Sequence, residues 1–287
     1  MVSCGAALDF SSDLLIDHLS LLYQMIFSSG IVPKCFCEGK LIPVLKRGKP
    51  PHLCSSYRPI TVSNVFCKLF ELLTCEEIRS KCYVPSGQFG FQKGLGCGHA
   101  LSALCAILLD ADAASESLVL GSHDVHRAFD SLVHEYILHS AYKRGINPSV
   151  IGAYRDLYGN LVVRIYIPGL SDIYVVLPVY KGVRQGSIVS PDFFNNAIIE
   201  PQSQIECSCI VRGLNLSLVC YADDVFMPCR TIARLEENFK MLNDEYRKIG
   251  LSFNAAKSEI VLYNWNDSTD VSVRLGDITV KPVTSLT

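Results

Sequence analysis

Apolar residues recur every three or four positions in several parts of the chain, which predicts amphipathic helices. The clearest helix begins after Thr231, a good N-cap, and ends at Gly250, with apolar side chains on one face between them. Ser131 is expected to cap another helix that includes Ile137. Further helices are predicted over residues 11–30, 64–73, 99–109, 148–154 and 191–198, and the first should bury Leu15, Leu19, Leu22 and Ile26.

Shorter apolar runs between these helices predict β-strands. They cover residues 40–45, 118–120, 162–167, 173–179, 216–219, 225–227, 260–263, 271–275 and 278–280. Pro168 and Gly169 should form the turn of a hairpin. Mixed strands and helices indicate an α+β fold, and 287 residues are enough for one large domain or two lobes.

Two adjacent carboxylates, Asp223 and Asp224, follow Tyr221 and Ala222 between two of the apolar runs. The runs are typical of strands, and the step from Ala222 to Asp223 is typical of the turn between them. A third carboxylate, Asp124, follows another strand. If the strands are neighbours, Asp124 and Asp223 meet, and such oxygen ligands suit Mg²⁺. The alternative is a solvated acidic turn and a loop-capping Asp124.

Six short motifs occur along the chain in one order. They are SSYRPI and KLFE at 55–60 and 68–71, QFGFQKG at 88–94, DVHRAFD at 124–130, GVRQGSIVSP at 182–191, YADD at 221–224, and GLSFN at 250–254 followed by Lys257. In this order they resemble the reverse transcriptase domain of non-LTR (LINE-type) retrotransposons. The resemblance runs from about residue 20 to the end of the chain.

The resemblance implies a right-hand polymerase palm, an antiparallel sheet backed by helices, with fingers. It also implies that the thumb is missing, because the chain stops at Thr287. The expected division is 1–90 for the N-terminal helix and fingers, 91–131 for the first part of the palm, 132–183 for a fingers insertion, and 184–287 for the palm with the catalytic hairpin.

The resemblance also implies the chemistry of the acidic residues. Asp124 and Asp223 are the expected ligands of two Mg²⁺ ions about 4 Å apart, with Asp224 in support and Mn²⁺ as a substitute. Lys257 is the expected general acid for the departing pyrophosphate. Without the resemblance, Lys257 would be an ordinary surface lysine.

Nucleotide contacts follow from the same resemblance. Lys46 and Arg58 are expected to hold the triphosphate, where a guanidinium offers a planar fork and an ammonium a point charge. Phe129 matches the steric gate that favours deoxynucleotides. Gln185 is expected to touch the incoming nucleotide, and Gly186 to allow close approach of the backbone. Apart from the resemblance, Lys46 and Arg58 would be solvated charges and Phe129 a core aromatic.

Primer and template contacts are expected from Tyr221, Ser190 and Pro191. The net charge of −2 is low for a protein that binds nucleic acid. Residues 31–100 nevertheless carry ten basic and four acidic side chains, a local charge of +6 that leaves −8 elsewhere. A basic lobe beside an acidic one fits a template channel that meets a metal site. Weak non-specific binding of nucleic acid by this chain is expected.

Composition bears on the cellular setting. The thirteen cysteines include no Cys-x-x-Cys pair, which favours free thiols in a reducing compartment. There is no run of eighteen uncharged apolar residues and no signal-peptide pattern at the N-terminus, so we expect no membrane partner. The expected location is intracellular, in the nucleus, the cytoplasm or both.

These observations predict an RNA-directed DNA polymerase domain that extends a primer 3′-end with deoxynucleotides by two-metal phosphoryl transfer. Its partners would be an RNA template, a DNA primer and deoxynucleoside triphosphates, while the oligomeric state stays open. The main alternative is a truncated, inactive or domesticated relative that only binds RNA. An RNA-dependent RNA polymerase would share the palm, and Phe129 disfavours it.

Overall fold

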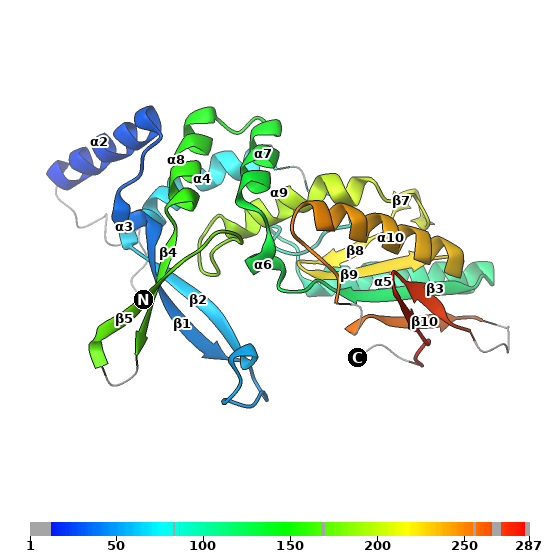
Figure 1. The fold of residues 1–287 in the computed structure, drawn as a ribbon. Helices are drawn as coiled ribbons and strands as arrows, with labels where there is room; N and C mark the ends of the chain where they lie inside the picture. The colour runs from blue at the N-terminus through cyan, green and yellow to red at the C-terminus, as the bar shows by residue number, and fades with distance from the viewer. Residues whose placement is uncertain are drawn as a thin grey trace. The chain divides into compact units, whose positions relative to one another are not determined.

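The computed structural model describes residues 13–284, apart from residues 83, 86, 168–169, 255–256 and 266–270. Helices and strands are mixed along the chain, which confirms the expected α+β fold (Figure 1). The chain divides into one unit of residues 1–83 and 132–194 and a second unit of residues 84–131 and 195–287. The four-part division given above remains a prediction.

A four-stranded sheet organises the first unit, in the order β2-β1-β4-β5. Its strands are β1 (Glu38–Leu45), β2 (Tyr57–Ser63), β4 (Val162–Ile167) and β5 (Leu170–Pro178). β1 and β4 are parallel, and the other two pairs are antiparallel. The helices are α2 (Asp13–Ser29), α3 (Lys34–Cys37), α4 (Val65–Lys81), α7 (His134–Lys143) and α8 (Pro148–Gly159).

Aromatic rings form the core of the first unit. Phe70 on α4 is fully buried, and its ring lies 5.4 Å from Tyr154 of α8 and 5.6 Å from Phe27 of α2, measured between centroids. Tyr23 and Phe36 complete the cluster around Phe70. Because aromatic rings bury large apolar areas, this cluster joins helices that lie far apart in the sequence.

A second four-stranded sheet, in the order β10-β3-β9-β8, is antiparallel throughout. Its strands are β3 (Leu118–Asp124), β8 (Val219–Tyr221), β9 (Asp224–Cys229) and β10 (Glu259–Tyr263). Two small hairpins are formed by β6 (Ile210–Val211) with β7 (Leu214–Asn215), and by β11 (Val273–Leu275) with β12 (Ile278–Val280).

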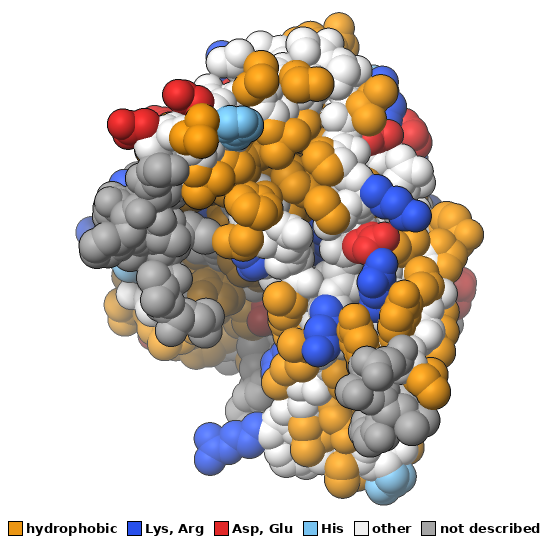
Figure 2. All heavy atoms as spheres, turned by 90° about the vertical axis from the view of Figure 1, so that its left-hand side faces the viewer, with side chains coloured by type: hydrophobic (Ala, Val, Ile, Leu, Met, Phe, Trp, Pro, Cys, Tyr) orange, Lys and Arg blue, Asp and Glu red, His pale blue; other side chains and the backbone are white. Residues whose placement is uncertain are grey.

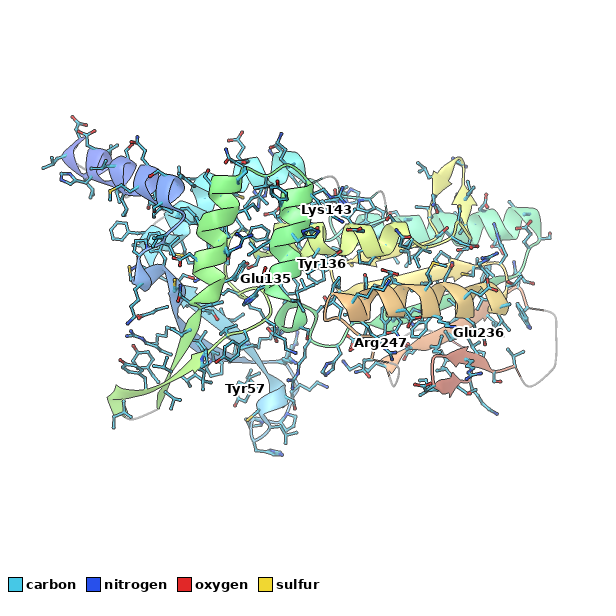
Figure 3. The ribbon with its side chains drawn as sticks, turned by 45° about the horizontal axis from the view of Figure 1, so that its top comes forward. Tyr57, Glu135, Tyr136, Lys143, Glu236 and Arg247 are labelled. Carbon is cyan, nitrogen blue, oxygen red and sulfur yellow. The ribbon has the colours of Figure 1, made fainter. Side chains whose placement is uncertain are left out.

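Helices back this second sheet. They are α5 (Cys97–Ala114) and α10 (Ile232–Lys248). The short helix α6 (Ala128–Ser131) also belongs to the second unit, while α9 (Ser190–Ser203) begins in the first unit and continues into the second. α10 lies across the sheet and buries Leu235, Phe239 and Leu242 (Figure 1). Glu236 on α10, labelled in Figure 3, accepts a hydrogen bond from the backbone N–H of Arg274 and so attaches β11.

Local signals placed most of the helices correctly. Thr231 caps α10 by accepting a hydrogen bond from the N–H of Arg234 at 3.2 Å, and Asn64 caps α4 by accepting from Phe66 at 2.8 Å. Pro148 occupies the first turn of α8. The hairpin of β4 and β5 is also confirmed, and its expected turn at residues 168–169 lies outside the described residues.

Ser131 does not cap a helix, and that prediction is wrong. Ser131 ends the short helix α6, and α7 begins only at His134. The reason is long-range pairing. Val133 forms a β-bridge with Lys181, and the carbonyl of Leu132 accepts a hydrogen bond from the N–H of Gly182 at 2.6 Å. These contacts hold Val133 in an extended conformation, so the helix starts later. The strands β2, β6 and β7 and the short helix α3 were not predicted.

The expected apolar stripe of α2 is buried at Ile26 but not along its whole length. Within this helix only Tyr23 and Ile26 are buried, and Leu15 is 43% exposed. Other apolar side chains of α2 are also exposed, namely Leu14, Ile16, Leu21 and Met25. Hydrophobic side chains gather on the face of the molecule seen in Figure 2. Contacts with α4 and α8 cover only one side of α2, so its helical period correctly predicts a helix and overstates its burial.

One helix among the described residues, α5, is long and apolar enough to cross a membrane, judged by length and composition only. Core helices of soluble proteins pass the same test, so a single such helix is weak evidence. α5 buries Ala100, Ile107 and Ala111 in an apolar cluster of the second unit. It also carries Asp110 and Asp112, which is why no uncharged run was found in the sequence.

Candidate active site

Strand register brings two of the three acidic residues together in the second unit. Asp124 is the last residue of β3, Asp224 is the first residue of β9, and the two are direct partners across the antiparallel pair. Asp223 lies next to them in the turn between β8 and β9. Cross-strand partners have Cβ atoms about 5 Å apart, so their carboxylates can share a cation.

The turn that carries Asp223 has two residues. Tyr221 and Asp224 are paired at its base, and Ala222 takes the left-handed conformation with φ 60°. This is the tight β8–β9 turn that the sequence predicts. An unusual backbone angle at a non-glycine residue has to be held by its surroundings.

Gln88 holds that turn, and sequence reasoning assigned it no role. Its buried side chain donates to the carbonyl of Ala222 at 3.2 Å and accepts from the N–H of Ala222 at 3.0 Å. The same oxygen accepts from the N–H of Gly90 at 2.8 Å. A Cβ at Gly90 would lie 2.2 Å from the backbone nitrogen of Ala222, so only glycine fits. The signal that the sequence offered for this role was the polar residue Gln88 at the start of the QFGFQKG motif.

Like charges crowd this site. Burial, followed by repulsion from Asp223 and Asp124, raises the pKa of Asp224 above its ordinary value, and Lys257 opposes the shift. The ammonium of Lys257 lies 2.9 Å from Oδ2 of Asp124. Asn254 places the lysine, because its N–H donates to the carbonyl of Asp124 at 2.8 Å and its carbonyl accepts from the N–H of Lys257 at 2.9 Å.

The residues present fit a divalent cation. Within the described part of the chain, no three His, Cys, Asp or Glu side chains form a ready-made metal cage. Mg²⁺ is usually held by one or two carboxylates together with substrate phosphates, so a complete protein cage is not required. A cation would relieve the repulsion at Asp224. His123, beside Asp124, is buried between Phe239 and Phe253 and therefore packs in the core.

Phe129 lies on α6, five residues after Asp124. Its ring meets the ring of Phe91 edge-on, with centroids 5.5 Å apart. Phe91 is itself in the left-handed region, with φ 60°, and is 47% exposed. The second unit thus contains Phe129, Tyr221, Lys257 and the three carboxylates.

The other predicted site residues belong to the first unit. Lys46 follows β1, and its ammonium donates to the carbonyl of Ser55 at 3.1 Å. Tyr57, labelled in Figure 3, donates to the carbonyl of Pro51 at 2.9 Å and braces the loop that joins β1 to β2. Arg58 is exposed on β2, paired with Val44 of β1. Both cations are therefore at the solvent-exposed end of one hairpin.

Gln185 and Gly186 lie in the loop between β5 and α9. The carbonyl of Gln185 accepts from the N–H of Thr61 at 2.7 Å. Gly186 has φ +118°, and a Cβ there would lie 2.6 Å from the carbonyl oxygen of Thr61, so this position requires glycine. Ser190 is buried where α9 begins, and Pro191 occupies the first turn of that helix.

His134 anchors the start of this loop and gives a prediction about pH. Its Nε2 lies 2.8 Å from the carbonyl oxygen of Gly182, and its ring stacks on Tyr158. Burial lowers the pKa of His134, although the bond to Gly182 and the charge of Glu135 oppose the shift. The unfolded chain therefore takes up a proton before the folded chain does. The stabilising contribution of neutral His134 is fully present above pH 6.5 and is lost as the pH falls below that value.

Between pH 7 and pH 5 this group can remove at most about 2 kcal/mol of the free energy of unfolding. Urea titrations at both pH values, on the wild type and on His134→Gln, measure the effect. We expect the substitution to flatten the pH dependence while glutamine keeps a donor for Gly182. An unchanged slope in the variant would assign the pH dependence to other groups.

Comparison with known proteins gives the family. Residues 44–285 match the family model described as "Reverse transcriptase (RNA-dependent DNA polymerase)". The chain is 24% identical over 246 residues to a "Retrovirus-related Pol polyprotein from type-1 retrotransposable element R2" of Bradysia coprophila, covering 84% of this chain and 28% of that protein. It is 26% identical over 189 residues to an "RNA-directed DNA polymerase from mobile element jockey" of Drosophila melanogaster, covering 64% and 20%.

The fold is also found among solved structures. Apo telomerase from Candida tropicalis, truncated from its C-terminal domain, superposes with a TM-score of 0.57 at 13% identity, covering 94% of this chain and 59% of that one. This likeness supports the polymerase palm. The chain spans less than a third of the length of the curated relatives it matches. It belongs to the reverse transcriptase (RNA-dependent DNA polymerase) family and is a LINE-type, non-LTR retrotransposon domain of that family.

Proposed function

We propose that this chain extends a primer 3′-end with deoxynucleotides on an RNA template, with Asp124, Asp223 and Asp224 as the acidic centre. The observation that carries the proposal is the register of β3 and β9, which pairs Asp124 with Asp224 beside the turn that holds Asp223. Membership of the reverse transcriptase family supports the same reaction.

The three carboxylates would hold divalent ions, Mg²⁺ or Mn²⁺. When bound, these ions lower the pKa of the primer hydroxyl and neutralise the departing pyrophosphate. Asp124 is paired with Lys257 at 2.9 Å, and a cation held by Asp124 would compete with the ammonium for this carboxylate. Lys257 would then donate its Nζ proton to an oxygen of the pyrophosphate. At 64% exposure its side chain has room to move.

The remaining residues would bind and select the nucleotide. Arg58 and Lys46 offer a guanidinium fork and an ammonium to the triphosphate. Gln185 would contact the nucleotide from a loop whose backbone is fixed at Thr61. Tyr221, Ser190 and Pro191 would contact primer or template. Two further telomerase structures of similar fold, from Candida albicans and Candida tropicalis, were solved in complex with a fragment of telomeric RNA, which supports an RNA partner here.

Primer extension tests the proposal directly. The full 287-residue chain is incubated with oligo-dT annealed to poly-rA, labelled deoxythymidine triphosphate, and Mg²⁺ or Mn²⁺. We expect extension that stops when the ions are chelated and resumes when they are restored. Binding of the RNA without extension under both metals would overturn the proposal in favour of the RNA-binding alternative, and preference for ribonucleotides would favour an RNA polymerase.

A further inference from the structure

A buried ion pair lies beneath the loop of residues 182–190, which carries Gln185 and Gly186. Oε1 of Glu71 accepts from Nη2 of Arg184 at 2.9 Å, and the two side chains are 0% and 3% exposed. Replacing a buried ion pair by apolar residues is often neutral or stabilising. The stability of the fold alone therefore does not account for two charges at this position.

The geometry of Glu71 shows what the pair holds. Its second oxygen, Oε2, accepts from the backbone N–H of Ile188 at 2.9 Å. One carboxylate thus grips the chain on both sides of the three residues that separate Arg184 from Ile188. The guanidinium is fixed in turn, because its Nη1 donates to the carbonyl of Phe36 at 3.0 Å.

One face of α4 supplies further contacts to the same loop. Lys68, three residues before Glu71, donates to the carbonyl of Gly186 at 3.0 Å. Cys67 accepts from Nη2 of Arg184 at 3.4 Å. The N–H of Ser187 donates to the carbonyl of Arg184 at 3.2 Å and closes a turn. The backbone around Gln185 is therefore held in one conformation by a single helix face and its ion pair.

We infer that Glu71 and Arg184 are positioning residues that set the conformation from which Gln185 meets the incoming nucleotide. Both are buried, so they act through the loop and not on the nucleotide itself. The inference rests on the proposed function, since that function supplies the nucleotide. It assigns a role in the reaction to the acidic residue of the KLFE motif and the arginine of the GVRQG motif.

Substitution of Glu71 by Gln tests the inference. Gln keeps the size of the side chain and one acceptor but removes the charge that neutralises Arg184. We expect the KM for deoxythymidine triphosphate to rise about tenfold with kcat within about twofold of the wild type. In a Gln185→Ala background the same substitution should raise KM by less than about twofold, because the side chain it positions is gone.

A second variant guards against loss of folding in Glu71→Gln. Lys68→Met removes one exposed contact to the loop, and we expect a KM about threefold above wild type. Lys81→Met is the matched control, an exposed lysine in the last turn of the same helix, and its kinetics should not change. Equal behaviour of the two lysine variants, or additive effects of Glu71→Gln and Gln185→Ala, would overturn the inference.

Hydrogen exchange separates this inference from the proposed function, because it needs no catalysis. Glu71→Gln should speed exchange of the Ile188 amide at least about tenfold while the amides of α8 keep their protection. Uniformly faster exchange across the first unit would show a structural role only and would contradict the inference. The wild type could fail to extend primers while Glu71→Gln still shows this local exchange effect. That result would overturn the proposed function but not the role of Glu71 in holding the loop.

Discussion

Replacing Asp124 by Asn should slow primer extension by a factor of about 1,000 or more, equivalent to about 4 kcal/mol in the activation barrier. Asn keeps the shape of the side chain at the end of β3 but removes the negative charge. Asp223→Asn should have an effect of similar size. Extension is followed at saturating nucleotide, so that the loss is assigned to kcat.

Stability should move differently from activity. Asp224→Asn removes a carboxylate whose pKa is raised by burial and by repulsion from Asp223 and Asp124. The variant should therefore be less active and yet at least as stable as the wild type at pH 7. Asp124→Asn leaves Lys257 without its partner, but that lysine is 64% exposed, so the cost in stability should be small.

Asp277→Asn is the matched control for these substitutions. Asp277 is an exposed carboxylate in the turn between β11 and β12, within the same unit. Its variant should extend primers at the wild-type rate. If Asp124→Asn were as active as Asp277→Asn, the acidic centre would be a solvated turn and the proposed role of Asp124 would be wrong.

Local signals in the sequence were enough for the elements that carry this centre. The β8–β9 turn at Ala222-Asp223 follows from two apolar runs and a two-residue gap, and the start of α10 follows from Thr231. These features depend on neighbours in the chain, so spacing and capping chemistry predict them. The fold class followed from the same signals.

Register and long-range pairing were beyond local signals. Sequence reasoning expected Asp124 to meet Asp223, whereas the direct cross-strand partner of Asp124 is Asp224. A shift of one residue changes which side chains face each other, and only the paired strands fix it. Ser131 failed as a cap for a similar reason, because pairing of Val133 with Lys181 lies outside any local window.

The sequence also did not predict which polar residues are buried and hold the backbone in place. Gln88, Glu71 and Arg184 look like ordinary polar residues in the sequence. Only the folded structure shows that they are buried and bonded to backbone groups. The motifs contained these residues, but no charge or hydropathy pattern separates them from surface side chains. Their contacts join segments more than a hundred residues apart.

Truncation of Phe129 to Val should weaken the preference for deoxynucleotides by about 100-fold, chiefly by raising kcat/KM for ribonucleotides. The ring is expected to exclude a 2′-hydroxyl, and its position is fixed by the edge-on contact with Phe91 at 5.5 Å. Val keeps an apolar side chain but lacks the flat surface. Steady-state competition between deoxythymidine and uridine triphosphates on poly-rA measures the ratio.

Phe66→Val is the matched control for this truncation, because Phe66 is a 41% exposed aromatic on α4 in the other unit. It should leave the ratio unchanged. If Phe129→Val lowered kcat/KM equally for both nucleotides, Phe129 would be a packing residue of α6 and not a steric gate. A core aromatic is the role that its residue type alone suggests. A selective gain with ribonucleotides requires that the ring meets the sugar, because stability affects both substrates alike.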